Sequence, residues 1–418
     1  MSSVVLALWI ALIGADRIDL AGGHGPFIVT PFLALTPVVV ASELWRRAAR
    51  HRPLTLSRYA LGYAMCAAGL ICVTMVSVFR AREMPVSAAR TFLLIGDVTG
   101  TFVVAVLCAD RPDLTRTLAK GALACLVLYG VFDVAEVLWY VGRAPELIRI
   151  GPMTARFDAL QNAGPLPRLA GPVADGNRGG FVVLFYIVVI GAAAELSAST
   201  RRIGVGFAVL FLVLTLSRSA AMGAMATLAM AMISRRRRVS ARLLVLGALA
   251  VAVAATYLLV RPRTFDQIEA ILSSPVASRL SVTEGSAQSH LELIKRGIDE
   301  GMESVPRAAF GLGYGNSYLV LQDIFPGNRY GNFHSLYVTM FAEGGIFALI
   351  LTLLLMGVPL VTGGPWRALI AGSFAFNVFY QTTTEPVFWF LLALAWLTIP
   401  RAASRPGLTA AVEHGTRH

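Results

Sequence analysis

Long uninterrupted apolar runs recur from one end of the 418-residue chain to the other. Runs of this length are typical of helices that cross a bilayer, and their continuity is unlike the alternating pattern of a membrane β-barrel. The pattern predicts an all-α polytopic membrane protein, with residues 1–418 forming a single integral membrane domain. Counting the runs gives about twelve transmembrane helices, at 3–14, 27–45, 58–79, 91–109, 118–141, 180–197, 203–217, 219–234, 242–261, 334–361, 367–380 and 386–400.

Composition supports the membrane class. Hydrophobic residues make up 56% of the chain and charged residues only 14%, whereas a soluble domain carries about a quarter charged residues. The four cysteines lie within or beside apolar runs without metal-ligand spacing, which indicates small core residues. The first run has no basic segment before it, so we interpret it as a first span rather than a cleaved signal.

The net charge of +12 is largely a topology signal. No basic face with interleaved aromatic residues is present, so we expect no nucleic-acid partner. Basic segments at 45–52, 200–202, 235–238, 365–367 and from 401 onward all fall on one side of the counted spans. The positive-inside rule makes that side cytoplasmic, together with a tail at 401–418 that we expect to be disordered. The exception is "FRAREMPVSAAR" at 79–90, an Arg-bearing loop that the count places outside.

Two long segments are predicted to face outward, at 143–178 and at 262–333 between the ninth and tenth spans. The second is too long to be a plain connector. Within it, "SAQSHLELIKRGIDEGMES" at 286–304 carries apolar residues at helical spacing, namely Leu291, Ile294, Ile298 and Met302. This stripe predicts an amphipathic helix that lies against the membrane-embedded body.

One charged residue interrupts a strongly apolar stretch: Arg218 in "LTLSRSAAMG" at 214–223. The span count places it at an outward turn, where it is either an arginine whose head group reaches the membrane surface or a ligand for an anion. Ser217 and Ser219 flank it and can donate hydrogen bonds. Further arginines crowd the outward segments, at positions 143, 149, 156, 168, 178, 261, 263, 279, 296, 307 and 329. Because a guanidinium binds phosphate through two parallel hydrogen bonds, this excess favours an anionic ligand.

Two further segments carry candidate chemistry. "AAFGLGYGNSYLV" at 308–320 contains Gly311 and Gly313 and does not follow a strand, which argues against a dinucleotide fingerprint and favours a tight turn beside a ligand or a helix. His334 opens a long apolar helix and is either a boundary residue or a proton-transfer group. Glu343 follows deeper in that helix, where a carboxylate is either paired with an arginine or functional.

Four patches, in this order, resemble the O-antigen ligase and O-antigen polymerase family of bacterial membrane glycosyltransferases. They are "DGNRGGFVVLFYIVVIG" at 175–191, which contains Asn177, "LTLSRSAAMGAMATLAM" at 214–230, "ESVPRAAFGLGYGNS" at 303–317 and "FHSLYVTMFAEGGIFALIL" at 333–351.

The resemblance implies a glycosyltransferase in the bacterial cytoplasmic membrane with its active site on the outer face. Such enzymes move a polyprenyl-pyrophosphate-linked glycan onto an acceptor hydroxyl, carried by another glycan or by a lipid. It implies that Arg218 binds the pyrophosphate and stabilises the departing diphosphate, and that His334 orients or deprotonates the acceptor. Asn177, Gly311, Gly313 and Glu343 become candidate substrate-binding residues. No cofactor and no metal are implied, because arginines supply the positive charge.

The chain departs from the family pattern at two places. Many relatives have an arginine before the amphipathic helix, where this chain has His290, so Arg279 or Arg296 is expected to supply the second guanidinium, with Arg279 favoured. Relatives also commonly have Asn after the histidine, where this chain has Ser335. These departures bear on the substrate rather than on the transferase chemistry.

Other functions were weighed against transfer. A polymerase is slightly favoured over a ligase, because nothing in the sequence is specific for lipid A. The alternative class is a transporter or flippase of a lipid-linked anionic glycan, which should line a path with deep charges. Charged residues deep in the spans are few, at Asp133, Glu136, Glu195 and Glu343, and no internal repeat is present. A structural scaffold would explain neither Arg218 nor His334.

Overall fold

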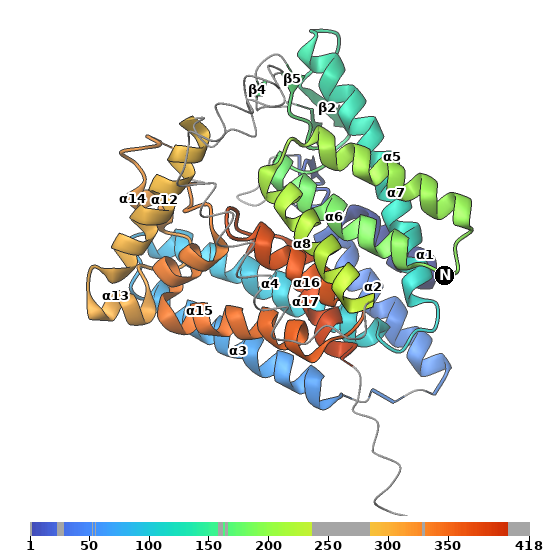
Figure 1. Cartoon of the computed structure of the whole chain (residues 1–418), viewed down its shortest axis with the longest axis horizontal. Coiled ribbons are helices and arrows are strands. Elements are labelled where there is room, and N and C mark those ends of the chain that lie inside the picture. The colour runs from blue at the N-terminus through green and yellow to red at the C-terminus, as the bar shows by residue number, and fades with distance from the viewer. Residues whose placement is uncertain are drawn as a thin grey trace, which may run out of the picture.

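The computed structural model describes residues 2–22, 29–51, 53–54, 56–157, 162–163, 166–235, 285–327 and 331–399. These residues form a mainly helical bundle (Figure 1). The predicted ninth span, the whole of 262–284 including Arg279, and the tail at 401–418 lie outside the described residues. The helices are α1 (Ser2–Leu12), α2 (Pro31–Ala49), α3 (Arg58–Val78), α4 (Met84–Cys108), α5 (Leu114–Tyr140), α6 (Gly176–Ala192), α7 (Ala198–Leu214), α8 (Arg218–Arg235), α12 (Gly285–Met302), α13 (Val305–Phe310), α14 (Ser317–Val320), α15 (Leu336–Thr362), α16 (Arg367–Phe376) and α17 (Pro386–Leu397).

Four helices among the described residues are long and apolar enough to cross a membrane: α3, α4, α5 and α15. Four shorter apolar helices accompany them, α1, α6, α16 and α17. The membrane class is therefore confirmed, whereas the count of twelve spans stays a prediction. Several predicted spans are shorter as helices because apolar residues continue into a turn. For example, α16 ends at Phe376, where Asn377 turns back and its Nδ2 donates to the Ser373 carbonyl over 2.9 Å.

The segment that follows α5 contains short strands that the apolar pattern did not predict. β2 (Leu147–Ile150) and β3 (Met153–Arg156) pair antiparallel, and β1 (Ile18–Asp19) adds to the other edge of β3. β4 (Asn162–Ala163) pairs with β5 (Leu166–Pro167). Runs of two to four residues carry too little alternation to be recognised in sequence.

Deep acidic side chains of α5 hold this segment in place. Glu136 is fully buried and pairs with Arg17, and its Oε2 accepts a hydrogen bond from the Ala170 amide over 3.2 Å. Arg17 in turn donates to the Gly171 carbonyl over 3.2 Å. The charge at Glu136 therefore anchors the loop between β5 and α6 to the bundle, which fixes the position of Arg168 within that loop.

The amphipathic helix is confirmed as α12, and it packs against α15, but the contacting face differs from the prediction. Leu293 is buried, and a Cβ at Gly297 would lie only 2.4 Å from Val338 Cγ1. Leu291, Ile298 and Met302, from the predicted stripe, are instead exposed on the surface of the chain. Close approach of two helices requires small residues at the contact, so the glycines together with Leu293, rather than the predicted stripe, mark the packed face.

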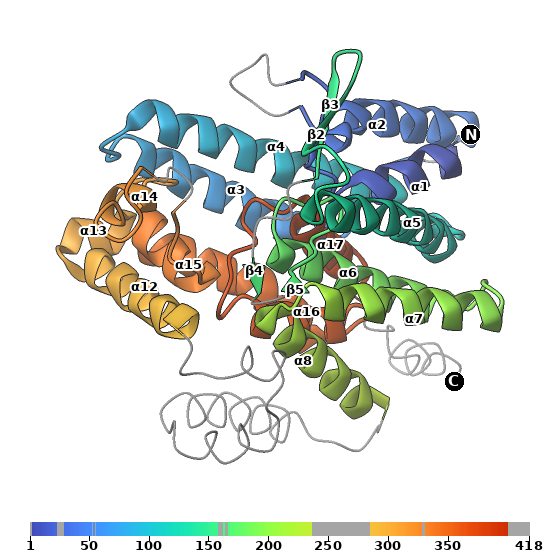
Figure 2. The ribbon, with the colours of Figure 1, turned by 90° about the horizontal axis from the view of Figure 1, so that it is seen from above.

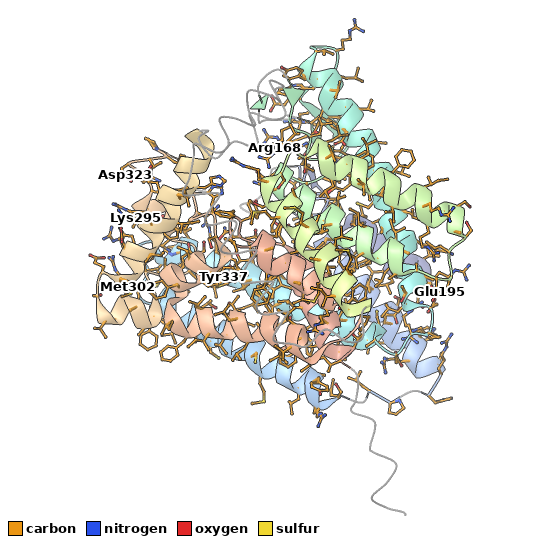
Figure 3. The ribbon with its side chains drawn as sticks, in the orientation of Figure 1. Arg168, Glu195, Lys295, Met302, Asp323 and Tyr337 are labelled. Atoms are coloured by element: carbon orange, nitrogen blue, oxygen red, sulfur yellow. The ribbon has the colours of Figure 1, made fainter. Side chains whose placement is uncertain are left out.

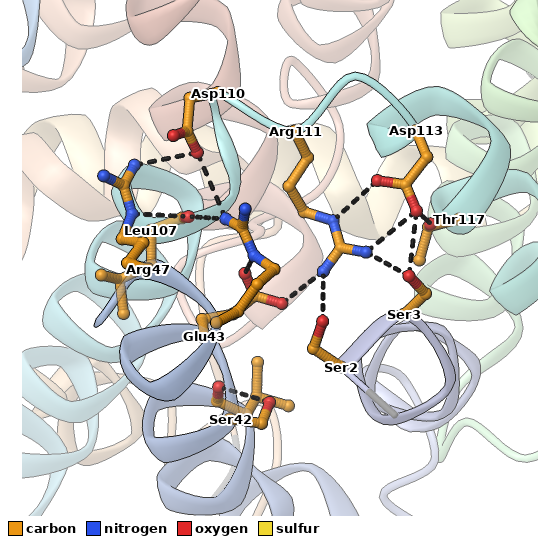
Figure 4. A network of polar contacts seen from close by, with 12 residues as sticks. Ser2, Ser3, Ser42, Glu43, Arg47, Leu107, Asp110, Arg111, Asp113 and Thr117 are labelled. Atoms are coloured by element: carbon orange, nitrogen blue, oxygen red, sulfur yellow. Dashed lines mark hydrogen bonds and ion pairs between the residues drawn. The ribbon is translucent and has the colours of Figure 1, made fainter. Parts of the chain in front are cut away.

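Helices α12, α13 and α14 gather at one end of the bundle, and the N-terminus lies at the other (Figures 1 and 2). At the N-terminal end, a buried polar network joins α1, α2 and the turn between α4 and α5 (Figure 4). Glu43 accepts from Arg46 over 2.7 Å and pairs with Arg111, which also bonds Asp113 over 3.0 Å. Asp110 pairs with Arg46 over 3.2 Å and with Arg47 over 2.9 Å.

We expect Glu43→Ala to destabilise the protein by about 3–5 kcal/mol, because it leaves two buried guanidiniums without their shared carboxylate. Unfolding of the chain in detergent micelles, followed by circular dichroism, measures the effect. The matched control is Asp110→Asn, whose side chain is about a third exposed at 34% and which should cost far less. Equal destabilisation by the two variants would contradict the role given to Glu43.

Candidate functional site

The turn between α7 and α8 presents Arg218, as the span count predicted. α7 ends at Leu214, Leu216 adopts a left-handed conformation with φ 47°, and Arg218 is the first residue of α8. Ser217 Oγ donates to Asn177 Oδ1 over 2.8 Å, and Ser219 Oγ donates to the Phe379 carbonyl over 3.3 Å. The two flanking serines therefore fix the turn to its neighbours.

A second guanidinium, Arg168, lies against the same turn. Its Nε donates to the Thr215 carbonyl over 2.7 Å, and its Nη2 bonds the Oδ1 of Asn177. Asn177 is held in turn by Asp175, the N-cap of α6, whose carboxylate accepts from the Asn177 amide over 2.6 Å. Asn177 thus orients Arg168 and Ser217 through its side chain. Sequence reasoning counted Arg168 among the outward arginines but did not assign it to the site.

Two imidazoles stack face to face across the site. The ring centroids of His290, from α12, and His334, just before α15, lie 4.4 Å apart with an angle of 18° between the rings. Tyr380 meets His334 edge-on with centroids 6.3 Å apart. His334 has φ 51°, and its backbone amide donates to Asn332 Oδ1 over 2.9 Å. Its Nδ1 is buried and has no hydrogen-bond partner among the described residues.

Both arginines act electrostatically on the histidine pair. Burial lowers the pKa of His290 to about 3, and His334, Arg218 and Arg168 add to this lowering, while Asp175 opposes it. Burial also lowers the pKa of His334; Asp175 works against this shift and Arg168 works with it. Both imidazoles are therefore neutral at pH 7. The structure brings Arg168, Arg218, His290 and His334 together from four separate segments of the chain.

Glu343 has a different setting. Its fully buried carboxylate accepts hydrogen bonds from the Gly315 amide over 2.8 Å and from the Ser317 amide over 3.0 Å. The glycine-rich turn just before Gly315 also packs closely against α15. Gly311 in this turn has φ 74°, and a Cβ there would lie 2.2 Å from the Glu343 carbonyl carbon. Gly313 has φ 106°, and its amide donates to the Glu343 carbonyl oxygen over 3.1 Å. The sequence left open whether this tight turn lies beside a ligand or beside a helix, and the structure places it beside α15.

Arg296 lies on the outer side of α12. It forms long ion pairs with Glu300 at 3.4 Å and with Asp323 at 3.9 Å, and 44% of its side chain is exposed. In Figure 3, its neighbour Lys295 and its partner Asp323 lie well away from Arg168, and Glu195 is far from all three. Arg279 lies outside the described residues. Within the described ranges, Arg168 rather than Arg296 accompanies Arg218 at the histidine pair.

The constellation combines two guanidiniums with two neutral imidazoles, which suits an anionic leaving group beside a proton acceptor. In the portion of the chain that the structure covers, no group of three or more His, Cys, Asp or Glu is arranged to hold a metal ion. Comparison with known families adds a further observation. Residues 203–353 match the O-antigen ligase family.

This match supports the resemblance inferred from the sequence: it covers three of the four patches, whereas the patch at 175–191 precedes it. The O-antigen ligase segment contains Arg218, His290, His334 and Glu343, whereas Arg168 and Asn177 precede it. No curated protein matches the chain. Together with the apolar helices, the match describes a membrane protein with an O-antigen ligase-like segment, and it leaves the donor, the acceptor and the outward face to be argued from the site.

Proposed function

We propose that this protein transfers a polyprenyl-pyrophosphate-linked glycan to an acceptor hydroxyl at the outer face of the bacterial cytoplasmic membrane. The observation that carries the proposal is the convergence of Arg168 and Arg218 on the stacked pair His290 and His334. The family match supports the general activity. The positive-inside distribution of the basic loops supports the outward face.

In this reaction the acceptor oxygen forms a bond to the anomeric carbon of the glycan, and the bond from that carbon to the lipid diphosphate breaks. The diphosphate gains negative charge as it leaves. Arg218 and Arg168 stabilise that charge more strongly in the transition state than in the bound donor, which accelerates the step. The hydrogen bonds from Arg168 to Thr215 and Asn177 hold its guanidinium in position before the donor arrives.

His334 takes the proton of the acceptor hydroxyl. A base must be neutral before the reaction, and burial meets this condition by lowering the pKa of the imidazole. Its Nδ1, which lacks a partner among the described residues, is the atom for this role. The stacked ring of His290 limits rotation of His334, so His290 orients the base at the place where many relatives carry an arginine.

We expect Arg168→Gln to lower the catalytic efficiency of glycan transfer about 10- to 100-fold, because one charge-assisted hydrogen bond to the leaving group is lost. The measurement is transfer by the purified chain in nanodiscs with a synthetic polyprenyl-pyrophosphate-linked oligosaccharide. Arg149→Gln, an exposed arginine of β2, is the matched control and should leave the rate unchanged. Equal rates for the Arg168 variant and the parent protein would remove Arg168 from the site.

A deletion strain distinguishes the possible activities. Accumulated single lipid-linked repeat units would indicate a polymerase, and long chains that stay unattached to their acceptor would indicate a ligase. Depletion of the donor from the outer face, with the donor retained inside, would instead indicate a flippase and would overturn the transferase proposal. The measurement is mass analysis of lipid-linked oligosaccharides, combined with gel analysis of surface polysaccharide.

A further inference from the structure

The Arg-bearing loop between α3 and α4 packs against the glycine-rich turn that follows α13. The Glu83 amide donates to Asn316 Oδ1 over 3.0 Å, and the Tyr318 hydroxyl donates to Glu83 Oε2 over 2.5 Å. A Cβ at Gly313 would lie 2.5 Å from the Ala81 Cβ. This loop, whose charge the positive-inside rule disfavours on the outer side, therefore belongs to the α12–α14 end of the bundle.

A small cavity opens between this loop and α13 and α14. It has a volume of about 50 Å³ and is lined by Arg80, Arg82, Arg307, Gly311, Leu312, Asn316, Leu319 and Val320. Three guanidinium-bearing residues and no acidic residue line it. A cavity of this size exceeds what one water needs and has room for a group of a few heavy atoms. We refer to it as the Arg80 pocket.

The charges in the Arg80 pocket are only partly compensated. Arg307 forms ion pairs with Glu300 at 3.0 Å and with Glu303, and both acids line an adjoining, more open hollow together with Arg296 and Asp323. Arg80 and Arg82 form no side-chain hydrogen bond or ion pair with the residues that the structure describes. Arg82 also lines the adjoining hollow that contains Glu300, Glu303 and Asp323, whereas Arg80 lines only the Arg80 pocket. Neither guanidinium is paired with a carboxylate among the described residues.

Asn316 gives an independent indication of a ligand. Its side chain is fully buried, and its Oδ1 is used by the Glu83 amide. Its Nδ2 carries two N–H donors, and no partner for it exists among the described residues. Leaving a buried donor unsatisfied is costly, and a bound anion would remove that cost.

We propose that the Arg80 pocket binds a phosphate-class anionic group carried by the acceptor substrate. This proposal rests on the proposed transferase function. α12 connects the two regions: His290 lies near its start, and Glu300, which forms an ion pair with the pocket residue Arg307, lies near its end, about 15 Å further along the helix axis. The pyrophosphate of the donor is held at the histidine end, and the acceptor is held by its own anion at the other end of the same helix. Its hydroxyl then extends along α12 towards His334.

Binding of radiolabelled inorganic phosphate tests the pocket without any transfer reaction. The full chain carries Arg218→Gln, to weaken the donor site, and sits in phosphatidylcholine nanodiscs. Adding Arg80→Gln and Arg82→Gln should weaken phosphate binding at least about tenfold, since each lost charge-assisted contact contributes about that factor. Adding Asn316→Asp should weaken it as well, because Asp keeps the acceptor for Glu83 and replaces the donor by a negative charge. Adding Arg143→Gln instead is the matched control and should leave binding unchanged.

Equal phosphate affinity before and after the double substitution would overturn the pocket. A second arm identifies the source of the anion. In chains with an intact donor site, the double substitution should raise the KM for acceptor about tenfold and leave the KM for donor unchanged. If phosphatidic acid in the nanodisc displaces phosphate while acceptor KM is unaffected, the pocket binds a bilayer headgroup and the acceptor assignment is overturned. Loss of transfer in Arg218→Lys tests the transferase function separately.

Discussion

Arg218→Lys is expected to reduce glycan transfer about 100- to 1,000-fold, the effect of losing one preorganised donor to a developing negative charge. Lysine keeps the positive charge but replaces a planar fork by a point charge, so it cannot make two parallel hydrogen bonds to a diphosphate. The turn itself should survive, because Ser217 and Ser219 hold it through their own side chains. The measurement is the rate of transfer by the purified variant in nanodiscs.

Insertion and stability provide the control for this variant. The amount of Arg218→Lys protein in the membrane fraction and its thermal midpoint should match those of the parent. Arg143→Lys, at an exposed arginine just beyond α5, should retain full transfer. Normal glycan synthesis by the Arg218 variant would show that the pyrophosphate is bound elsewhere.

His334→Ala is expected to lower turnover about 100- to 10,000-fold, the range for removal of a general acid–base group. Donor affinity should change much less, because in the proposed mechanism the arginines and not the imidazole hold the diphosphate. His51→Ala is a matched control: His51 has φ 50° and His334 has φ 51°, so both substitutions place alanine in the same unusual backbone conformation. Of the two substitutions, only His334→Ala removes a proposed catalytic group. Unchanged turnover in that variant would exclude the base assignment.

The pH dependence of the rate checks the same residue. The base works in its neutral form, and burial lowers its pKa below the ordinary histidine value of 6.5. The rate should therefore hold steady as pH falls from 8 to about 6.5, and decrease only when the pH passes below the lowered pKa. A fall centred on 6.5 or above would mean that the imidazole is solvated or that another group titrates.

Part of this site could be predicted from the sequence. Arg218 and His334 each interrupt or border an apolar run. A charged or titratable side chain in such a place often has a functional role, so both residues could be singled out from the sequence. Arg168 could not be assigned to the site from the sequence, because it is one of many arginines in the segments predicted to face outward. Only its hydrogen bonds to Thr215 and Asn177, which the fold creates, set it apart from the others. Glu343 could also be recognised as a candidate, because it lies deep in an apolar run. Its hydrogen bonds from the Gly315 and Ser317 amides could not be predicted, because they come from a loop about thirty residues earlier in the chain.

The sequence by itself determined the membrane class and the largely helical architecture, because hydrophobic run length is a local property of the chain. It also indicated the likeness to the O-antigen ligase family and two candidate site residues, because each of these rests on short local patterns. Only the tertiary structure decided which face of α12 packs, since the glycine contacts at Gly297 depend on the partner helix rather than on the apolar stripe. It also decided that His290 stacks on His334, although more than forty positions separate them in the sequence. Contacts of this kind are set by the packing of distant segments, and no pattern within either segment encodes them.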